Sequence, residues 1–281
     1  MWSTPMVREK IFSLVVATLA FSPIQALAAP IDELVAALKM PELFQVLSEE
    51  GQVYGKTLED QMFPGEGGAR WGQIVGVIHE AERLKTQSVA RMGKELEGKE
   101  ALVSQMTAFF TSPEGVRVID SEVAARKALV DENLREIAEA AYADLETTDS
   151  QRVEQYERLI KANDLIEQNV AGAMNSNLAF LRGMSAAGGI DGNIPEAELM
   201  ADLWAQEPQI RAETEGWMSA YSTLAYGALS LQEVESYVAF SASEAGQALN
   251  HALFAAFNET FDATSFEMGM AVVRFAEGQD I

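Results

Sequence analysis

The chain has 281 residues, of which 48% are hydrophobic, and its formal net charge is −23. Length and apolar content suffice for a substantial core, whereas the negative charge argues against nucleic acids and anionic lipid surfaces as partners, because like charges repel. No cysteine is present, which excludes disulfides, thiolate catalysis and cysteine-linked lipid anchors.

The first 28 residues have the features of a secretory signal peptide. Arg8 and Lys10 form a basic segment, residues 11–21 are apolar, and Ala26-Leu27-Ala28 matches the small-x-small cleavage pattern. The apolar stretch is shorter than the roughly 18–20 residues needed to span a bilayer. We therefore expect cleavage near Ala29, a periplasmic location in preference to secretion, and no stable membrane insertion after cleavage. An uncleaved membrane anchor is the alternative.

Helical periodicity dominates the rest of the chain. Apolar side chains recur at three- and four-residue spacing over 71–84, 116–137 and 249–257. No sustained stretch alternates with period two, so the sequence predicts an all-α fold. Helices are expected to stop or bend at prolines and glycine-rich segments, namely Pro41, 63–68, 188–192 and Pro208.

Two segments of the chain match at an offset of 131 residues. Residues 103–115 align with residues 234–246, and at the same offset residues 32–35 align with residues 163–166. We interpret this as a duplication, with a signal peptide over 1–28, a first helical repeat over 29–148 and a second over 149–281. Asp149 is expected to cap a helix at the junction. The predicted architecture is an antiparallel multi-helix bundle built from two related halves.

Both copies contain the same expected corner between two helices. Its residues are Phe109, Ser112, Pro113 and Gly115 in the first copy, and Phe240, Ser243 and Gly246 in the second. The serines are N-cap residues, the proline suits the first helical position, and the glycines indicate close approach by another backbone. The phenylalanines are expected to fill the gap between the two helices. Ser230 and Glu233 predict a capping box at the start of the second incoming helix. We interpret the corner as a structural motif, with a ligand-contacting corner as the alternative.

The segment Phe109-Phe110-Thr111-Ser112-Pro113-Glu114-Gly115, with amphipathic helices on both sides, resembles the proteobacterial family named domain of unknown function 2059. The resemblance is clearest over about 80–145. The second copy departs from it, with Glu244-Ala245 where the first copy has Pro113-Glu114. The resemblance implies an exported helical protein and supplies no catalytic residues.

The sequence contains no recognisable catalytic constellation. His79 and His251 are the only histidines, and Arg83 occupies the place where a zinc-protease motif starting at His79 needs its second histidine. Residues 183–188 are one residue too long for the nucleophile elbow of a serine hydrolase. We therefore expect no enzyme activity, metal site or cofactor, with a carboxylate-based enzyme as a minor alternative.

Two functions remain as expectations. The first is a non-catalytic protein of the cell envelope that binds a protein or peptide partner with a basic surface, as the negative charge and helical repeats suggest. The alternative is a soluble carrier of a small apolar ligand in a cavity between helices. It is suggested by aromatic and methionine side chains on the helices that lead to the corners, although an ordinary core is the simpler interpretation. The aromatic residues in question are Trp71, Trp204, Trp217, Tyr221 and Tyr226.

Overall fold

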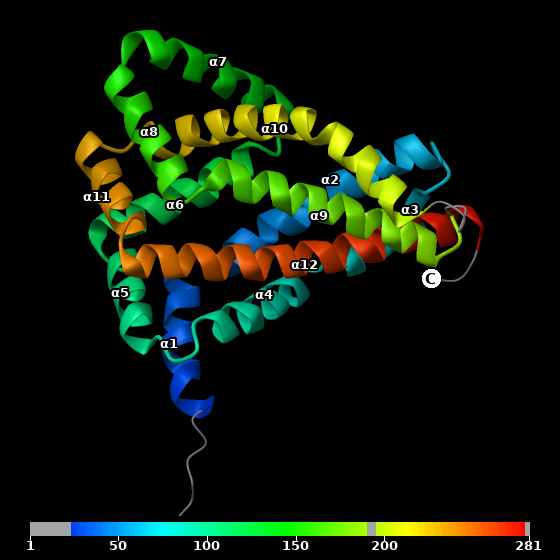
Figure 1. Ribbon diagram of the computed structural model, residues 1–281, viewed down its shortest axis with the longest axis horizontal. Helices are drawn as coiled ribbons and strands as arrows, with labels where there is room; N and C mark the ends of the chain where they lie inside the picture. The colour runs from blue at the N-terminus through cyan, green and yellow to red at the C-terminus, as the bar shows by residue number, and fades with distance from the viewer. Residues whose placement is uncertain (1–23, 190–194, 279–281) are drawn as a thin grey trace, which may run out of the picture.

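The computed structural model describes residues 24–189 and 195–278, and over these ranges the protein is all-α, which confirms the predicted fold class (Figure 1). Residues 1–23 of the predicted signal peptide lie outside the described residues, as do residues 190–194, which include part of the break predicted over 188–192. The described helices are α1 (Ile24–Ala37), α2 (Met40–Met62), α3 (Gly68–Ile78), α4 (Ala81–Glu95), α5 (Glu100–Phe110), α6 (Pro113–Ala128), α7 (Glu132–Thr148), α8 (Ser150–Ala162), α9 (Leu165–Ala186), α10 (Glu196–Tyr226), α11 (Leu231–Ser241) and α12 (Glu244–Ala276). None of them is both long enough and apolar enough to cross a membrane.

Helix ends follow the local chemistry of the chain. The side chain of Asp149 accepts a hydrogen bond from the backbone N–H of Arg152 and so caps α8. Ser230 and Glu233 form the predicted capping box at the start of α11. Pro208 lies inside α10 and does not end it. Side chains of α10 are buried against α9 before the proline and against α7 after it, and this packing holds the helix together.

The last helix, α12, forms the centre of the bundle. Its 33 residues pack against α9, α4, α5 and α3, and Figure 1 shows it running through the middle of the molecule. Many of its buried residues are alanine, glycine and threonine, which let neighbouring helices approach closely. A helix contacted on several sides shows little amphipathic pattern, so its central position is not visible in its sequence.

Neighbouring helices run in both relative directions. α4 and α12 are antiparallel, as the pairs Ser88–Thr260 and Arg83–Glu267 show. α9 and α12 run parallel, as the hydrogen bonds Asn250–Asn163 and Ser176–Asp262 show. The parallel arrangement arises because α10 runs back along α9 before the chain turns through α11 into α12 (Figure 1).

The α9–α12 pair has the most extensive contact in the bundle, and two glycines make it possible. A Cβ atom at Gly183 would overlap the carbonyl oxygen of Phe266, and a Cβ atom at Gly269 would overlap the carbonyl oxygen of Phe180. Each glycine thus admits the backbone of the other helix. Gly183 belongs to the segment that is one residue too long for a nucleophile elbow, and its role here is helix packing.

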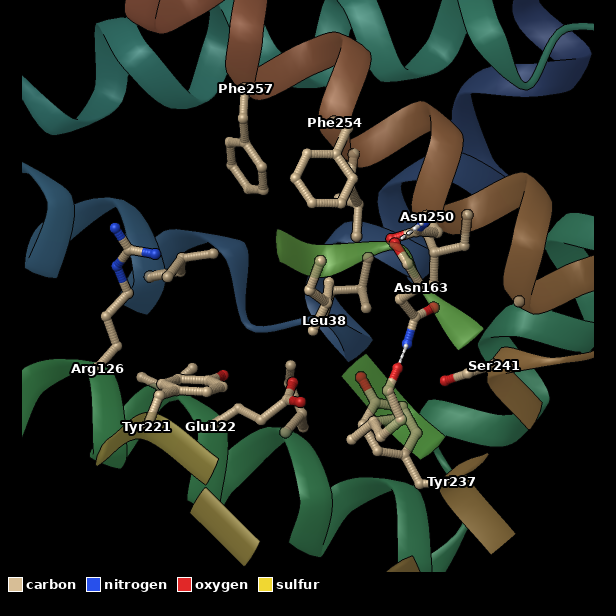
Figure 2. Close-up of a pocket in the computed structure, with 18 of the residues that line it drawn as sticks. Leu38, Glu122, Arg126, Asn163, Tyr221, Tyr237, Ser241, Asn250, Phe254 and Phe257 are labelled. Atoms are coloured by element: carbon tan, nitrogen blue, oxygen red, sulfur yellow. Dashed lines mark hydrogen bonds between the residues drawn. The ribbon is translucent and has the colours of Figure 1, made fainter. Parts of the chain in front are cut away.

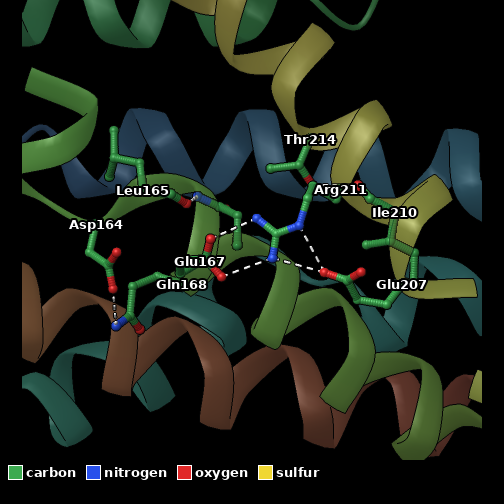
Figure 3. Close-up of polar contacts among 9 residues, drawn as sticks. Asp164, Leu165, Glu167, Gln168, Glu207, Ile210, Arg211 and Thr214 are labelled. Carbon is green, nitrogen blue, oxygen red and sulfur yellow. Dashed lines mark hydrogen bonds and ion pairs between the residues drawn. The ribbon is translucent and has the colours of Figure 1, made fainter. Parts of the chain in front are cut away.

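A cluster of ion pairs on the surface links α9 and α10. Arg211 of α10 donates from two guanidinium nitrogens to the Glu167 carboxylate of α9, over 2.6 and 2.9 Å, and also pairs with Glu207 at 2.8 Å (Figure 3). These hydrogen bonds, that to Glu167 first, raise the pKa of Arg211, and the hydrogen bond from Arg211 lowers the pKa of Glu167.

The two predicted corners have the same local geometry. α5 and α11 end five residues before the glycine of each corner, and in each the serine hydroxyl accepts a 3.1 Å hydrogen bond from that glycine's N–H. A Cβ atom at Gly115 would overlap the carbonyl oxygen of Phe109, and one at Gly246 would overlap that of Phe240. The backbone that approaches each glycine is therefore the last turn of the helix leading into the corner.

The aromatic residues of the corners pack on each other. The rings of Phe109 and Phe240 stack with centroids 4.1 Å apart and planes inclined by 9°. Sequence analysis placed each ring inside its own corner, whereas the structure joins the two corners through this stack. Contact between matching residues is what an approximate two-fold relation between two halves would produce, and the duplication itself stays a prediction.

The second predicted alignment, of residues 32–35 with residues 163–166, is wrong in register. Residues 32–35 lie inside α1, whereas Asn163 and Asp164 form the turn between α8 and α9. The residue with the same backbone conformation as Asp164 is Lys39, in the turn between α1 and α2. Lys39 has φ 49° and ψ 37°, and Asp164 has φ 51° and ψ 37°. These are the two non-glycine residues with positive φ in the part of the chain that the structure describes.

We expect Gly115→Ala and Gly246→Ala each to lower the free energy of unfolding by about 1–3 kcal/mol, because the new Cβ displaces a backbone carbonyl that cannot move independently. Gly93→Ala in α4 is the matched control, since open space surrounds that position. It should raise stability by roughly 0.5–1 kcal/mol through helix propensity. Urea denaturation measures all three, and unchanged stability in both corner variants would show that the corners tolerate a side chain.

Candidate functional site

A cavity of about 250 Å³ lies between α6, α10, α11 and α12, next to the second corner (Figure 2). Its wall is mostly aromatic and aliphatic. The lining residues are Leu38, Met40, Leu43, Phe110, Ile119, Glu122, Val123, Arg126, Leu159, Asn163, Leu165, Asn169, Trp217, Met218, Tyr221, Tyr226, Tyr237, Phe240, Ser241, Gly246, Leu249, Asn250, Leu253, Phe254 and Phe257. They come from segments far apart in the sequence, so the cavity exists only in the folded chain.

Helical spacing on α10 builds one aromatic wall. Trp217 and Tyr221 are four residues apart and therefore lie on the same face of the helix, where their rings stack at 5.0 Å. Tyr226 follows, with its ring 6.2 Å from that of Tyr221 and 6.2 Å from that of Tyr237 on α11. Tyr237 in turn stacks on Phe109 at 5.9 Å. A continuous series of aromatic rings thus connects the cavity wall to the two corners.

Glu122 of α6 is the acid in this wall. The Tyr226 hydroxyl donates a 2.7 Å hydrogen bond to its Oε1 atom, and the Tyr237 hydroxyl also hydrogen bonds to the carboxyl group. Burial raises the pKa of Glu122, and the two tyrosine hydrogen bonds lower it in part. Burial, followed by the charge of Glu122, raises the pKa values of Tyr226 and Tyr237 well above their usual value.

The other charged residue of the wall, Arg126, has a different partner. It donates two 2.9 Å hydrogen bonds to the carboxylate of Glu50 on α2, and its guanidinium carbon lies 5.6 Å from the ring centroid of Trp217. Figure 2 shows the Arg126 and Glu122 side chains leaving α6 in different directions. The positive charge of Arg126 is therefore directed to Glu50.

A pair of asparagines closes the side of the cavity next to α8. Asn250 of α12 donates a 2.9 Å hydrogen bond to the carbonyl oxygen of Asn163, and the Asn163 side chain donates to the carbonyl oxygen of Leu159 (Figure 2). These bonds satisfy carbonyl groups at the C-terminal end of α8. The asparagines are thus wall elements that hold α8 against α12.

A second cavity of about 420 Å³ adjoins the first, between α2, α9 and α12. The two share the lining residues Leu43, Arg126, Asn169, Phe254 and Phe257. The second cavity has more polar side chains, among them His79, a buried histidine whose pKa is lowered by burial. Its Nδ1 atom lies 3.1 Å from the carbonyl oxygen of Val75, consistent with a structural role.

Two residues of the predicted corner motif, Phe240 and Gly246, line the first cavity. The other motif residues, Phe109, Ser112, Pro113, Gly115 and Ser243, are not part of its wall. The second corner is thus a packing corner of which two residues line the cavity, and ligand contact at the corner stays a prediction. Of the aromatic residues singled out in the sequence, Trp217, Tyr221 and Tyr226 lie in the wall, whereas Trp71 is in a separate core cluster and Trp204 is exposed.

The residues weighed for metal or zinc-protease chemistry lie apart. His79 is buried, whereas His251 is exposed and lies 3.2 Å from Glu95. Glu80, which a zinc protease would use as a base, caps α4 by accepting hydrogen bonds from the N–H groups of Glu82 and Arg83. Within the described ranges no group of three or more metal-ligating side chains occurs.

Sequence analysis missed Glu122, although a signal for it exists. Val118, Ile119 and Ala125 are buried on α6, and Glu122 lies three or four residues from each of them, on the same face of the helix. A single acidic residue on an otherwise buried helical face is uncommon, because burying a carboxylate is costly. Its tyrosine partners lie about a hundred residues further along the chain and could not be identified without the fold.

No family model matches the chain, and neither a curated protein nor a solved structure matches it. The resemblance to domain of unknown function 2059 therefore stays a prediction.

We expect Glu122→Gln to raise the free energy of unfolding at neutral pH, with the gain shrinking as the pH falls toward 4.5. The pKa of Glu122 is raised in the folded state from its usual value of 4.5. The folded protein then holds this proton more tightly than the unfolded chain, so the wild type loses stability as the pH rises through the folded-state pKa. Urea denaturation from pH 4 to 8 measures the difference.

Asp60→Asn is the control for this comparison, because it removes an exposed negative charge outside the cavity. The prediction is contradicted if the free energies of unfolding of the wild type and of Glu122→Gln change in parallel with pH. Burial would then not disfavour the ionised form of the Glu122 carboxyl.

Proposed function

We propose that this chain is a non-catalytic carrier that holds a small, largely apolar molecule in the cavity between its helices. The observation that carries the proposal is the wall of aromatic and aliphatic side chains around about 250 Å³, next to a second cavity of about 420 Å³. An engineered apolar cavity of about 150 Å³ already binds benzene, and many ligand pockets measure roughly 300–1,000 Å³. The first cavity therefore suits a molecule with one ring or a short branched chain, and the adjoining second cavity adds room for a molecule of two or three rings.

The character of the wall favours binding over catalysis. Acid–base catalysis commonly uses two titratable groups with separated pKa values facing one substrate. Glu122 is the one carboxylic acid among the lining residues of the first cavity, and two tyrosines hold it by hydrogen bonds. Such an arrangement fixes the position of a polar group and gives a bound molecule its orientation.

Export and partner binding belong to the same proposal. A carrier of this kind would work in the periplasm after removal of residues 1–28, in keeping with the signal-peptide features of the sequence. A protein or peptide partner with a basic surface is the second candidate function, which the net charge of −23 favours. The two candidates are compatible, because a ligand in the cavity and a partner on the protein surface would use different residues.

The carrier proposal predicts binding of the uncharged fluorescent probe N-phenyl-1-naphthylamine, seen as enhanced emission. Leu253→Trp should reduce the affinity by about tenfold or more, because the larger side chain fills space that the ligand would occupy. Leu253 lines the cavity, whereas Leu224, on α10, is exposed and outside its wall, so Leu224→Trp is the matched control. Equal probe binding by both variants, or no binding by the wild type, would contradict the proposal.

The export proposal predicts that the mature protein begins at Ala29. Pro30 lies inside α1 of the full chain, and cleavage after Ala28 would leave it in the first turn, where proline is tolerated. Expression in a bacterial host, cell fractionation and N-terminal sequencing test this. A periplasmic fraction that lacks the protein, or a chain that retains its first residues, would contradict it.

A further inference from the structure

In the part of the chain that the structure describes, the acid of the cavity wall has no positive partner. Glu122 is partly buried, and ionised groups that are removed from water are normally paired with an opposite charge or bound to a metal. Among the described residues, the pKa of Glu122 responds to burial and to hydrogen bonds from Tyr226 and Tyr237, and no cation contributes. Arg126, one helical turn further along, is held by Glu50. The tyrosine hydroxyls can stabilise a carboxylate, but they do not balance its charge.

The rings beside this carboxyl suit a positive charge. The rings of Tyr221 and Tyr226 are inclined by 89°, and those of Tyr226 and Tyr237 by 54°, so they meet at angles around the acid. A cation is attracted to the faces of aromatic rings, and cages of inclined rings are a common way of binding substituted ammonium groups. The hydroxyls of Tyr226 and Tyr237 are committed to Glu122, which keeps these rings in place.

We propose that the cavity binds a small organic cation, namely a substituted ammonium group with an apolar substituent, whose charge is placed between Glu122 and the tyrosine rings. This inference rests on the proposed carrier function, because it assigns a class of ligand to the same cavity. The apolar substituent would lie against Leu253, Phe254 and Phe257 of α12, which line the cavity together with the acid. Figure 2 shows the two phenylalanines and Glu122.

The charges around the cavity agree with this assignment. Glu122 and Arg126 are its charged lining residues, and Arg126 forms its ion pair with Glu50. Repulsion from Arg126 would keep a cation on the Tyr226 and Tyr237 side of Glu122. The net charge of −23 raises the local concentration of cations around the whole protein and favours their approach.

Two probes of matching shape test the inference. Phenyltrimethylammonium carries a permanent positive charge, and tert-butylbenzene is its uncharged analogue, so the two differ in charge and hardly in size. We expect the full-length protein to bind the cation at least about tenfold more tightly than the uncharged analogue, as measured by calorimetry or by ligand-detected NMR. The gain comes from Glu122 and from the ring faces, which the uncharged analogue cannot exploit.

Glu122→Gln should remove most of this preference and leave tert-butylbenzene binding nearly unchanged, because glutamine keeps the shape of the side chain without its charge. Asp60→Asn removes an exposed negative charge outside the cavity and should leave both affinities unchanged. Tyr226→Phe keeps the ring but deletes the hydroxyl that bonds to Glu122, and should weaken cation binding by less than Glu122→Gln does. Thermal melting shows whether each variant is folded.

Binding of the cation should also weaken as the pH falls, because a proton neutralises Glu122. The groups that face it are Tyr221 and Tyr226 of α10, Tyr237 of α11 and Arg126 of its own helix. The tyrosine pKa values are raised well above 10 by burial, so Glu122 is the member of this group that titrates in the acidic range. Binding to Glu122→Gln should not depend on pH over this range.

The possible results separate this inference from the proposed function. Equal binding of both probes, or a preference for tert-butylbenzene, would overturn the cation assignment and leave the carrier function standing. A preference for the cation that survives in folded Glu122→Gln would also overturn it. Failure of both probes, together with failure of N-phenyl-1-naphthylamine, would overturn the carrier function and this inference with it.

Discussion

Close approach of helix backbones is the constraint on which the rest of this structure depends. At Gly183 and Gly269 the backbones of α9 and α12 come so close that a Cβ atom on either residue would overlap a carbonyl oxygen of the other helix. The same holds within each corner, at Gly115 and Gly246. Because protein interiors are closely packed, helices fixed in this way determine which gaps the larger side chains must fill. Where α6, α10, α11 and α12 meet, the aromatic side chains leave a cavity.

The corners and the cavity are linked through a few side chains. Phe240 belongs to the second corner, stacks on Phe109 of the first, and also lines the cavity. Tyr237, one turn before Phe240 on α11, hydrogen bonds to Glu122. The packing that shapes the corners therefore also sets the position of the acid and its tyrosine partners. The same helices therefore form the corner and part of the cavity wall.

Features decided by neighbouring residues could be predicted from the sequence. The N-caps at Ser112 and Asp149 and the capping box at Ser230 involve residues three positions apart, and the structure contains each of them. The all-α class followed from helical periodicity in the same way. Contacts between distant segments could not be predicted. Tyr226 and Glu122 are 104 positions apart, and nothing in either local sequence indicates their hydrogen bond. The continuity of α10 through Pro208 likewise depends on packing against other helices.

The face-to-face stack of Phe109 and Phe240 has a consequence for how this chain can evolve. In a symmetric dimer of identical subunits, one codon change alters both rings at a two-fold axis at the same moment. Here the two rings are encoded separately, so a mutation in one meets an unmutated partner. Replacing either ring with a smaller side chain would leave a void beside the other, at a cost typical of large-to-small core substitutions. A single substitution at either position is therefore disfavoured. We expect these two residues to change mainly through paired substitutions in which the second restores the packing lost in the first.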